Sequence, residues 1–92
     1  MPKLLVKRDP VIEAALAERQ EFTDGRNWQR SRKGNLWRTW EGLTVTIYYR
    51  QGRYRYSISN DLLPELRFSE ASYGDEQEAI EALADELGVG LL

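Results

Sequence analysis

The sequence predicts an α+β fold, in which a carboxy-terminal amphipathic helix packs on an antiparallel meander sheet of three or four strands and an additional helix precedes the sheet. Two observations carry this prediction. Residues 36–60 alternate aromatic or β-branched residues with polar ones at the period of a strand, whereas residues 75–88 repeat apolar residues at the period of a helix. An apolar sheet face and an apolar helix stripe bury each other in a two-layer domain.

Composition limits the size and the chemistry of this domain. The 92 residues are enough for one domain, 1–92, with a single modest core. Cysteine and histidine are both absent, which excludes disulfides, thiol nucleophiles, imidazole acid–base chemistry and metal sites with nitrogen or sulfur ligands. No apolar run approaches the about 20 residues of a membrane span. We therefore expect a cytoplasmic, non-enzymatic protein with no cofactor, no metal site and no membrane partner.

The first predicted helix covers residues 9–22, after a lead segment of residues 1–8 that has the pattern of a short edge strand around residues 4–6. Asp9 can cap the free N–H groups, and Pro10 fits the first helical position because it has no N–H to lose. One face of this helix is thinly apolar and consists of Ile12, Ala15, Leu16 and Arg19. We expect such a helix to need tertiary contacts or a partner in order to stay ordered.

Residues 23–35 are predicted to be a basic loop. Thr23-Asp24-Gly25 ends the helix, and the segment that follows is rich in arginine and lysine. Its one aromatic residue, Trp28, is expected to fold back onto the core because a tryptophan is costly to leave in water.

The antiparallel sheet is predicted to span residues 36–71. Its first three strands are Leu36–Trp40, Leu43–Arg50 and Arg53–Asn60, separated by Glu41-Gly42 and Gln51-Gly52. A two-residue turn at Gln51-Gly52 gives one apolar, aromatic face with Val45, Ile47, Tyr49, Tyr54, Tyr56 and Ile58. The other face is basic and rich in hydroxyl groups, with Thr44, Thr46, Tyr48, Arg50, Arg53, Arg55, Ser57 and Ser59. A slip by one residue would mix the two faces, which favours this register.

The first hairpin is not decided by the sequence. A two-residue turn at Glu41-Gly42 puts Trp40 on the core face and Trp37 outside, but it also turns the charged Arg38 inward. After a wider loop around Pro64, Leu66–Ala71 is the candidate fourth strand, with Leu66 and Phe68 on one side.

The second helix, residues 75–88, has the clearest signals. Asp75 and Glu78 form a capping box, and Gly88 is a stop signal before the tail of residues 89–92. The apolar stripe of this helix consists of Ile80, Leu83, Ala84 and Leu87. Its outer face is acidic, with Glu76, Glu81, Asp85 and Glu86, and is expected to keep the domain soluble.

Charge is distributed unevenly along the chain. Residues 26–55 hold eight basic residues and one acid, residues 61–92 hold nine acids and one base, and the net charge is −2. A basic segment with interleaved aromatic residues is typical of proteins that meet phosphate. The candidate nucleic-acid contacts are Tyr48, Arg50, Arg53, Arg55 and Trp37 on the sheet and Arg30, Arg32 and Lys33 in the loop. The alternative is a solvated face on which Tyr48 and Arg55 form an ordinary cross-strand pair.

A family resemblance points in the same direction. The strand Arg53-Tyr54-Arg55-Tyr56, the later strand ending near Ser72-Tyr73, and the helix opened by Asp75-Glu76-Gln77-Glu78-Ala79 resemble the three-strand-plus-helix modules of AP2-type and integrase-arm DNA-binding domains. The resemblance covers about Leu36 to Leu87. It implies that the sheet face opposite the helix enters the major groove, with contacts from Trp37, Tyr48, Arg50, Arg53 and Arg55. The chain departs from these modules by its amino-terminal helix and by the longer loop that contains Pro64.

We therefore expect a small domain that binds nucleic acid, DNA rather than RNA, through the basic aromatic sheet face and the basic loop. The alternative is a protein-interaction or homodimerisation module with a regulatory role, which uses the same face or the apolar tail of Val89, Leu91 and Leu92. The first hypothesis requires that the amino-terminal helix leave the sheet face free.

Overall fold

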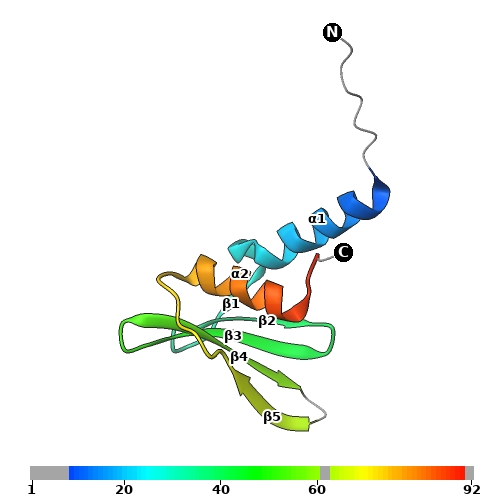
Figure 1. The fold of residues 1–92 in the computed structure, drawn as a ribbon. Coiled ribbons are helices and arrows are strands. Elements are labelled where there is room, and N and C mark those ends of the chain that lie inside the picture. Colours follow the sequence, from blue (N-terminus) through cyan, green and yellow to red (C-terminus); the bar gives the residue numbers. More distant parts are fainter. Residues whose placement is uncertain (1–8, 61–62, 91–92) are drawn as a thin grey trace.

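The computed structural model describes residues 9–60 and 63–90 and confirms the α+β class (Figure 1). The predicted edge strand near residues 4–6 and the tail residues Leu91 and Leu92 lie outside this range. Five antiparallel strands form one sheet in the order of the sequence. The elements are α1 (Pro10–Thr23), η1 (Gly25–Asn27), β1 (Gln29–Arg30), β2 (Leu36–Trp40), β3 (Leu43–Arg50), β4 (Arg53–Asn60), β5 (Leu63–Phe68) and α2 (Glu76–Leu87).

Two strand predictions were wrong. The predicted basic loop contains β1, in which Gln29 pairs with Trp37 and Arg30 with Leu36. This strand was missed because two polar residues carry no apolar alternation. The last strand begins at Leu63 and ends at Phe68, earlier than the predicted Leu66–Ala71. It includes a proline, which an edge strand tolerates because its outward N–H positions need no partner.

Both long hairpins turn through two residues with positive φ, as the Glu-Gly and Gln-Gly pairs suggested. Glu41 and Gly42 have φ of 47° and 81°, and Gln51 and Gly52 have φ of 54° and 80°. These values are those of the primed turns whose twist matches that of antiparallel strands. The predicted register between β3 and β4 is confirmed throughout, and it pairs Arg50 with Arg53, Tyr48 with Arg55, Thr46 with Ser57 and Val45 with Ile58.

The inward-facing Arg38 is accommodated by an aromatic surround. Its guanidinium carbon lies 5.1–6.0 Å from the ring centroids of Phe22, Trp28 and Trp40. Arg38 Nη2 pairs with Glu21 Oε1 at 2.9 Å, and the side chain is 13% exposed. The Arg38 charge is therefore compensated at the edge of the core. The first hairpin accordingly has the two-residue turn at Glu41-Gly42, with Trp40 on the core face.

The core lies between the sheet and α2. Asp75 caps this helix by accepting from the Glu78 N–H at 2.7 Å, and Gly88 ends it with a φ of 71°, as predicted. Trp28 also lies in the core, and its Nε1 donates to the Phe22 carbonyl at 2.7 Å. The buried apolar residues are Phe22, Trp28, Leu36, Val45, Ile47, Tyr56, Ile58, Ala79, Ile80, Leu83, Ala84 and Val89.

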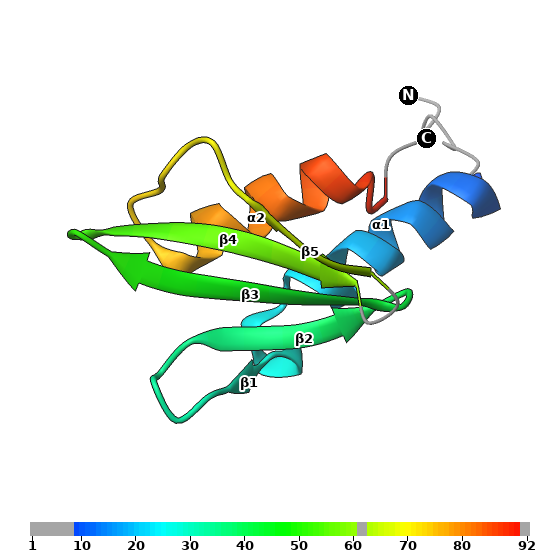
Figure 2. The same ribbon diagram turned by 90° about the horizontal axis from the view of Figure 1, so that it is seen from below.

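The amino-terminal helix does not cover the hydroxyl-rich sheet face. It packs beside α2 on the same face of the sheet (Figure 2), and its carboxy-terminal end reaches β2 through Phe22, whose ring centroid lies 4.9 Å from that of Trp40. Within α1, Phe22 is the buried residue, and Arg19 ties the helix to α2 through Asp85 at 2.9 Å. Seen from below, the sheet lies in front of both helices (Figure 2). The condition set by the leading hypothesis is therefore met by the arrangement of the layers.

Candidate nucleic-acid interface

The face of the sheet turned away from both helices is called the open face here. The β3–β4 register and the ends of β2 and β5 bring to it Trp37, Thr44, Thr46, Tyr48, Arg50, Arg53, Arg55, Ser57, Ser59 and Phe68. The sequence contains no acidic residue from Gly42 to Asn60, so the two central strands contribute positive charge alone. Neither helix covers this face, because α1 and α2 both lie on the opposite side of the sheet (Figure 2).

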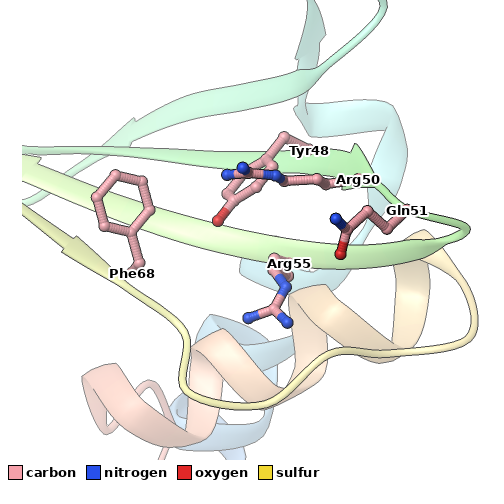
Figure 3. A pocket seen from close by; sticks show the side chains of 5 residues that line it. All are labelled: Tyr48, Arg50, Gln51, Arg55 and Phe68. Atoms are coloured by element: carbon pink, nitrogen blue, oxygen red, sulfur yellow. The ribbon is translucent and has the colours of Figure 1, made fainter.

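A hollow of about 400 Å³ lies at one end of the open face. It is lined by Tyr48, Arg50, Gln51, Arg55 and Phe68, whose rings and long side chains gather over the β3–β4–β5 region (Figure 3). The Tyr48 and Phe68 rings stand at 89° to each other with centroids 6.2 Å apart. They therefore form two walls of a right-angled corner, which we call the aromatic corner.

The arginines on the open face of β3 and β4 differ in whether their guanidinium groups have hydrogen-bond partners. Arg50 and Arg55 make no hydrogen bond or ion pair within residues 9–60 and 63–90. Arg53 lies opposite Arg50 in the ladder, and it donates from Nε to the Ser72 hydroxyl at 2.8 Å and from Nη2 to the Ser72 carbonyl at 3.1 Å. An anion bound between Arg50 and Arg55 would supply the hydrogen-bond acceptors that these two guanidinium groups lack.

Three other predicted contacts do not line the hollow. Trp37 is on the open face, on β2, opposite Thr46 and half-buried. Arg32 and Lys33 are exposed in the turn between β1 and β2. Leu36 pairs with Ile47, so this turn and the β3–β4 turn lie at the same end of the sheet (Figure 2). Positive charge from both hairpin tips thus collects at the end that carries the hollow.

Arg30, the remaining predicted contact, lies apart from the others. It is paired in β1 with the buried Leu36, and its guanidinium reaches α2, where Nη1 meets Glu76 Oε2 at 3.0 Å. The same Nη1 also donates to the Gly34 carbonyl at 2.7 Å. Arg30 therefore joins β1 to the helix layer, and the structure does not bring it to the open face.

Sequence reasoning missed Phe68 and Gln51 as members of the site. Phe68 is 55% exposed, and its face follows from the register, in which it lies opposite Ser57. The sequence put Phe68 on a strand, but that strand starts earlier than predicted. Only its pairing with β4, which places Phe68 opposite Ser57, shows that the ring lies on the open face. Gln51 was assigned to the turn alone, but its side chain also borders the hollow.

A second, smaller hollow of about 260 Å³ lies at the edge of the sheet and includes Tyr56, Tyr73 and Glu86. Tyr56 donates to Glu86 Oε1 at 3.1 Å, and burial together with this hydrogen bond raises the pKa of its phenol well above 10. A phenol with so high a pKa keeps its proton at neutral pH and makes a poor general base. Among the described residues, no three carboxylates are close enough together to hold a metal ion.

No helix in the described ranges is both long and apolar enough to cross a bilayer. Comparison with protein-family models, with curated proteins and with solved structures gave no match for this chain.

Proposed function

We propose that this chain is a small, non-enzymatic domain that binds nucleic acid through its open face. The observation that carries this proposal is the hollow at the end of that face, where Arg50 and Arg55 have no partner in the described ranges and lie beside the half-buried ring of Tyr48 and the exposed ring of Phe68. Guanidinium groups match phosphate oxygens, and aromatic rings match bases. The resemblance to AP2-type and integrase-arm modules favours DNA over RNA.

A titration by fluorescence anisotropy tests the proposal. Labelled DNA and RNA of mixed sequence are titrated at about 50 mM and about 200 mM salt, because phosphate neutralisation makes affinity fall as salt rises. The double variant Arg50→Gln/Arg55→Gln is expected to bind at least about 10-fold more weakly than the parent, since two phosphate contacts are lost.

Arg67→Gln is the control. It removes one positive charge, against two in the double variant, from a side chain that is 74% exposed but lies on the helix side of the sheet, opposite Ile58. Its affinity should stay close to that of the parent. Absence of binding by the parent at the lower salt, or an equal loss in the control, would overturn the proposal.

A second candidate function is protein interaction or homodimerisation, and the surface of α1 favours it. Val11, Ile12 and Leu16 are large apolar residues that remain exposed on this helix. The expected tail surface is reduced, because Val89 is buried at 2% exposure. Sedimentation at about 150 mM salt tests this function. A dimer that Leu16→Glu converts to a monomer would favour it over the nucleic-acid role.

A further inference from the structure

We infer that the open face takes single-stranded nucleic acid, with one unpaired base seated in the aromatic corner between Tyr48 and Phe68. This inference rests on the proposed function and narrows it to the class of ligand. It is carried by the corner, by the groups around it, and by the row of side chains that leads from it across the sheet.

The corner has the shape that a flat ring requires. The two rings meet at 89°, so a base that stacks on one of them brings its edge against the other. The Phe68 side chain is more than half exposed, although its ring has no group that can hydrogen-bond to water. Stacking on such a ring suits every base, because each has a π-face.

The polar groups around the aromatic corner suit the phosphate and the base edge of a nucleotide. Arg50 and Arg55 line the same hollow and can meet phosphate oxygens, while the Gln51 amide offers both donors and an acceptor to a base edge. The hollow of about 400 Å³ falls at the lower end of the range of small-molecule pockets, about 300–1,000 Å³. One nucleotide is therefore a suitable occupant in both size and chemistry.

A row of side chains continues from the corner across the open face. Through successive strand pairings, Phe68 lies opposite Ser57, Ser57 opposite Thr46, and Thr46 opposite Trp37. Small hydroxyl residues thus separate two aromatic platforms, which stand three strand spacings or about 14 Å apart. One base cannot touch both platforms. A strand that crosses the sheet would stack on Phe68 at one edge and on Trp37 near the other.

The same geometry disfavours a duplex, and in this it departs from the major-groove mode that the resemblance to AP2-type and integrase-arm modules implies. The major groove, about 12 Å wide, admits a helix or a two-stranded ribbon, whereas the open face is five strands or about 19 Å across. In a duplex the faces of the bases are covered by their neighbours, so neither aromatic platform has a surface to stack on. A single strand exposes those faces without any cost of unpairing.

Competition between strand types provides the test. Labelled oligo-dT and oligo-U, which lack internal pairing, are compared by anisotropy with a DNA duplex and an RNA duplex of the same length, at the lower salt concentration. We expect one or both single strands to bind at least about 10-fold more tightly than the duplex of the same sugar, and the two arms identify the sugar. Equal affinity for single strand and duplex would overturn the inference.

Substitution in the corner adds a second readout. Phe68→Ala is expected to weaken single-strand binding at least about 5-fold, because stacking is lost, and to leave duplex binding unchanged. Phe68→Leu keeps the apolar bulk without the flat ring and should show a similar loss, which separates stacking from folding. Tyr49→Ala is the control: this ring is 60% exposed but packs against Tyr54 on the other side of the sheet. A loss in the control as large as in Phe68→Ala would contradict the corner.

These outcomes distinguish the inference from the function on which it depends. If no single strand or duplex binds, both fail. If duplex binds as well as single strand and the Arg50→Gln/Arg55→Gln variant loses both, the open face binds nucleic acid and the single-strand inference alone is wrong.

Discussion

Arg38 is the single residue whose environment most departs from what its side chain normally prefers. The charge is almost enclosed by three aromatic rings, and Glu21 supplies the compensating carboxylate. Truncation to Ala would leave a void between those rings and free Glu21. We predict that Arg38→Ala lowers the free energy of unfolding by about 3 kcal/mol, measured by urea denaturation.

The control for this prediction is Arg26→Ala. Arg26 also pairs with an acid, Asp24 at 2.7 Å, but its side chain is 90% exposed. Solvent screens such a pair, so the free energy of unfolding should hardly change. A comparable loss in the two variants would mean that the aromatic surround of Arg38 contributes nothing.

Tyr56 carries a pH prediction. Burial and the hydrogen bond to Glu86 raise the pKa of its phenol above the ordinary value of 10.0. Above that pH the unfolded chain releases the proton while the folded protein still holds it, so the free energy of unfolding falls as pH rises. Below it both states are protonated and this contribution is complete. Denaturation between about pH 9 and about pH 11 should show a shallower fall in Tyr56→Phe than in the parent. Parallel curves would contradict the prediction.

At the scale of elements, the attachment of α1 depends on the turn that follows α2. Gly90 has a φ of 70°, and a Cβ built there would lie 2.6 Å from the Ala15 carbonyl oxygen and 2.7 Å from Arg19 Cβ. Gly88 has nearly the same φ, 71°, with no atom within 4 Å of such a Cβ. Both positions therefore disfavour alanine on conformational grounds, but only Gly90 also keeps the two helices in contact.

We predict that Gly88→Ala lowers the free energy of unfolding by about 1 kcal/mol through backbone strain. Gly90→Ala should cost about 2–4 kcal/mol, because the added methyl group also pushes α1 away from the end of α2. Hydrogen exchange of the α1 amides should accelerate in Gly90→Ala and stay unchanged in Gly88→Ala. Equal losses of stability would show that the close contact with α1 has no energetic weight.

The elements that were predictable are those with strong local signals. The Gln51-Gly52 turn determines which residues of β3 and β4 face each other, and alternation of apolar and polar residues then assigns the faces. Capping by Asp75 and termination by Gly88 likewise depend on residues close in sequence. In contrast, β1 has two polar residues, and β5 begins beside a register shift between Ser59 and Asn60. Neither feature leaves a periodic pattern to read.

The residues that line the hollow were likewise predictable only where the signal is local in the sequence. Tyr48, Arg50 and Arg55 came from the hairpin register, whereas Phe68 requires the pairing of β4 with β5. Arg30 was included because of its charge, but its partner Glu76 is distant in sequence. Ion pairs across layers depend on tertiary packing and cannot be recognised from composition. Sequence therefore predicted which residues of β3 and β4 share the open face, and packing determines which of their charged groups lack a partner in the described ranges.

At the scale of the whole molecule, the bases and acids do not form two separate surfaces. Three carboxylates of α2 are paired with arginines from three other elements: Asp85 with Arg19 of α1, Glu76 with Arg30 of β1, and Glu86 with Arg67 of β5 at 4.0 Å. The acidic helix face was expected to serve solubility, but most of its charges connect the layers. The bases left without such partners in the described ranges collect at the end of the open face that carries the two hairpin tips.

This distribution predicts how binding should respond to salt. The net charge is −2, so a polyanion gains little from the protein as a whole and must be held by the local bases. On the proposed function, Arg50, Arg55, Arg32 and Lys33 would provide two to four phosphate contacts. At about 0.7 counterions released per phosphate of a single strand, log K should fall with log salt at a slope between about −1.4 and −2.8. Arg50→Gln should make this slope shallower by about 0.7, whereas Arg67→Gln, on the helix side, should not change it. A slope several-fold steeper would mean that the ligand wraps beyond the open face, and a slope near zero would mean that the hollow holds no phosphate.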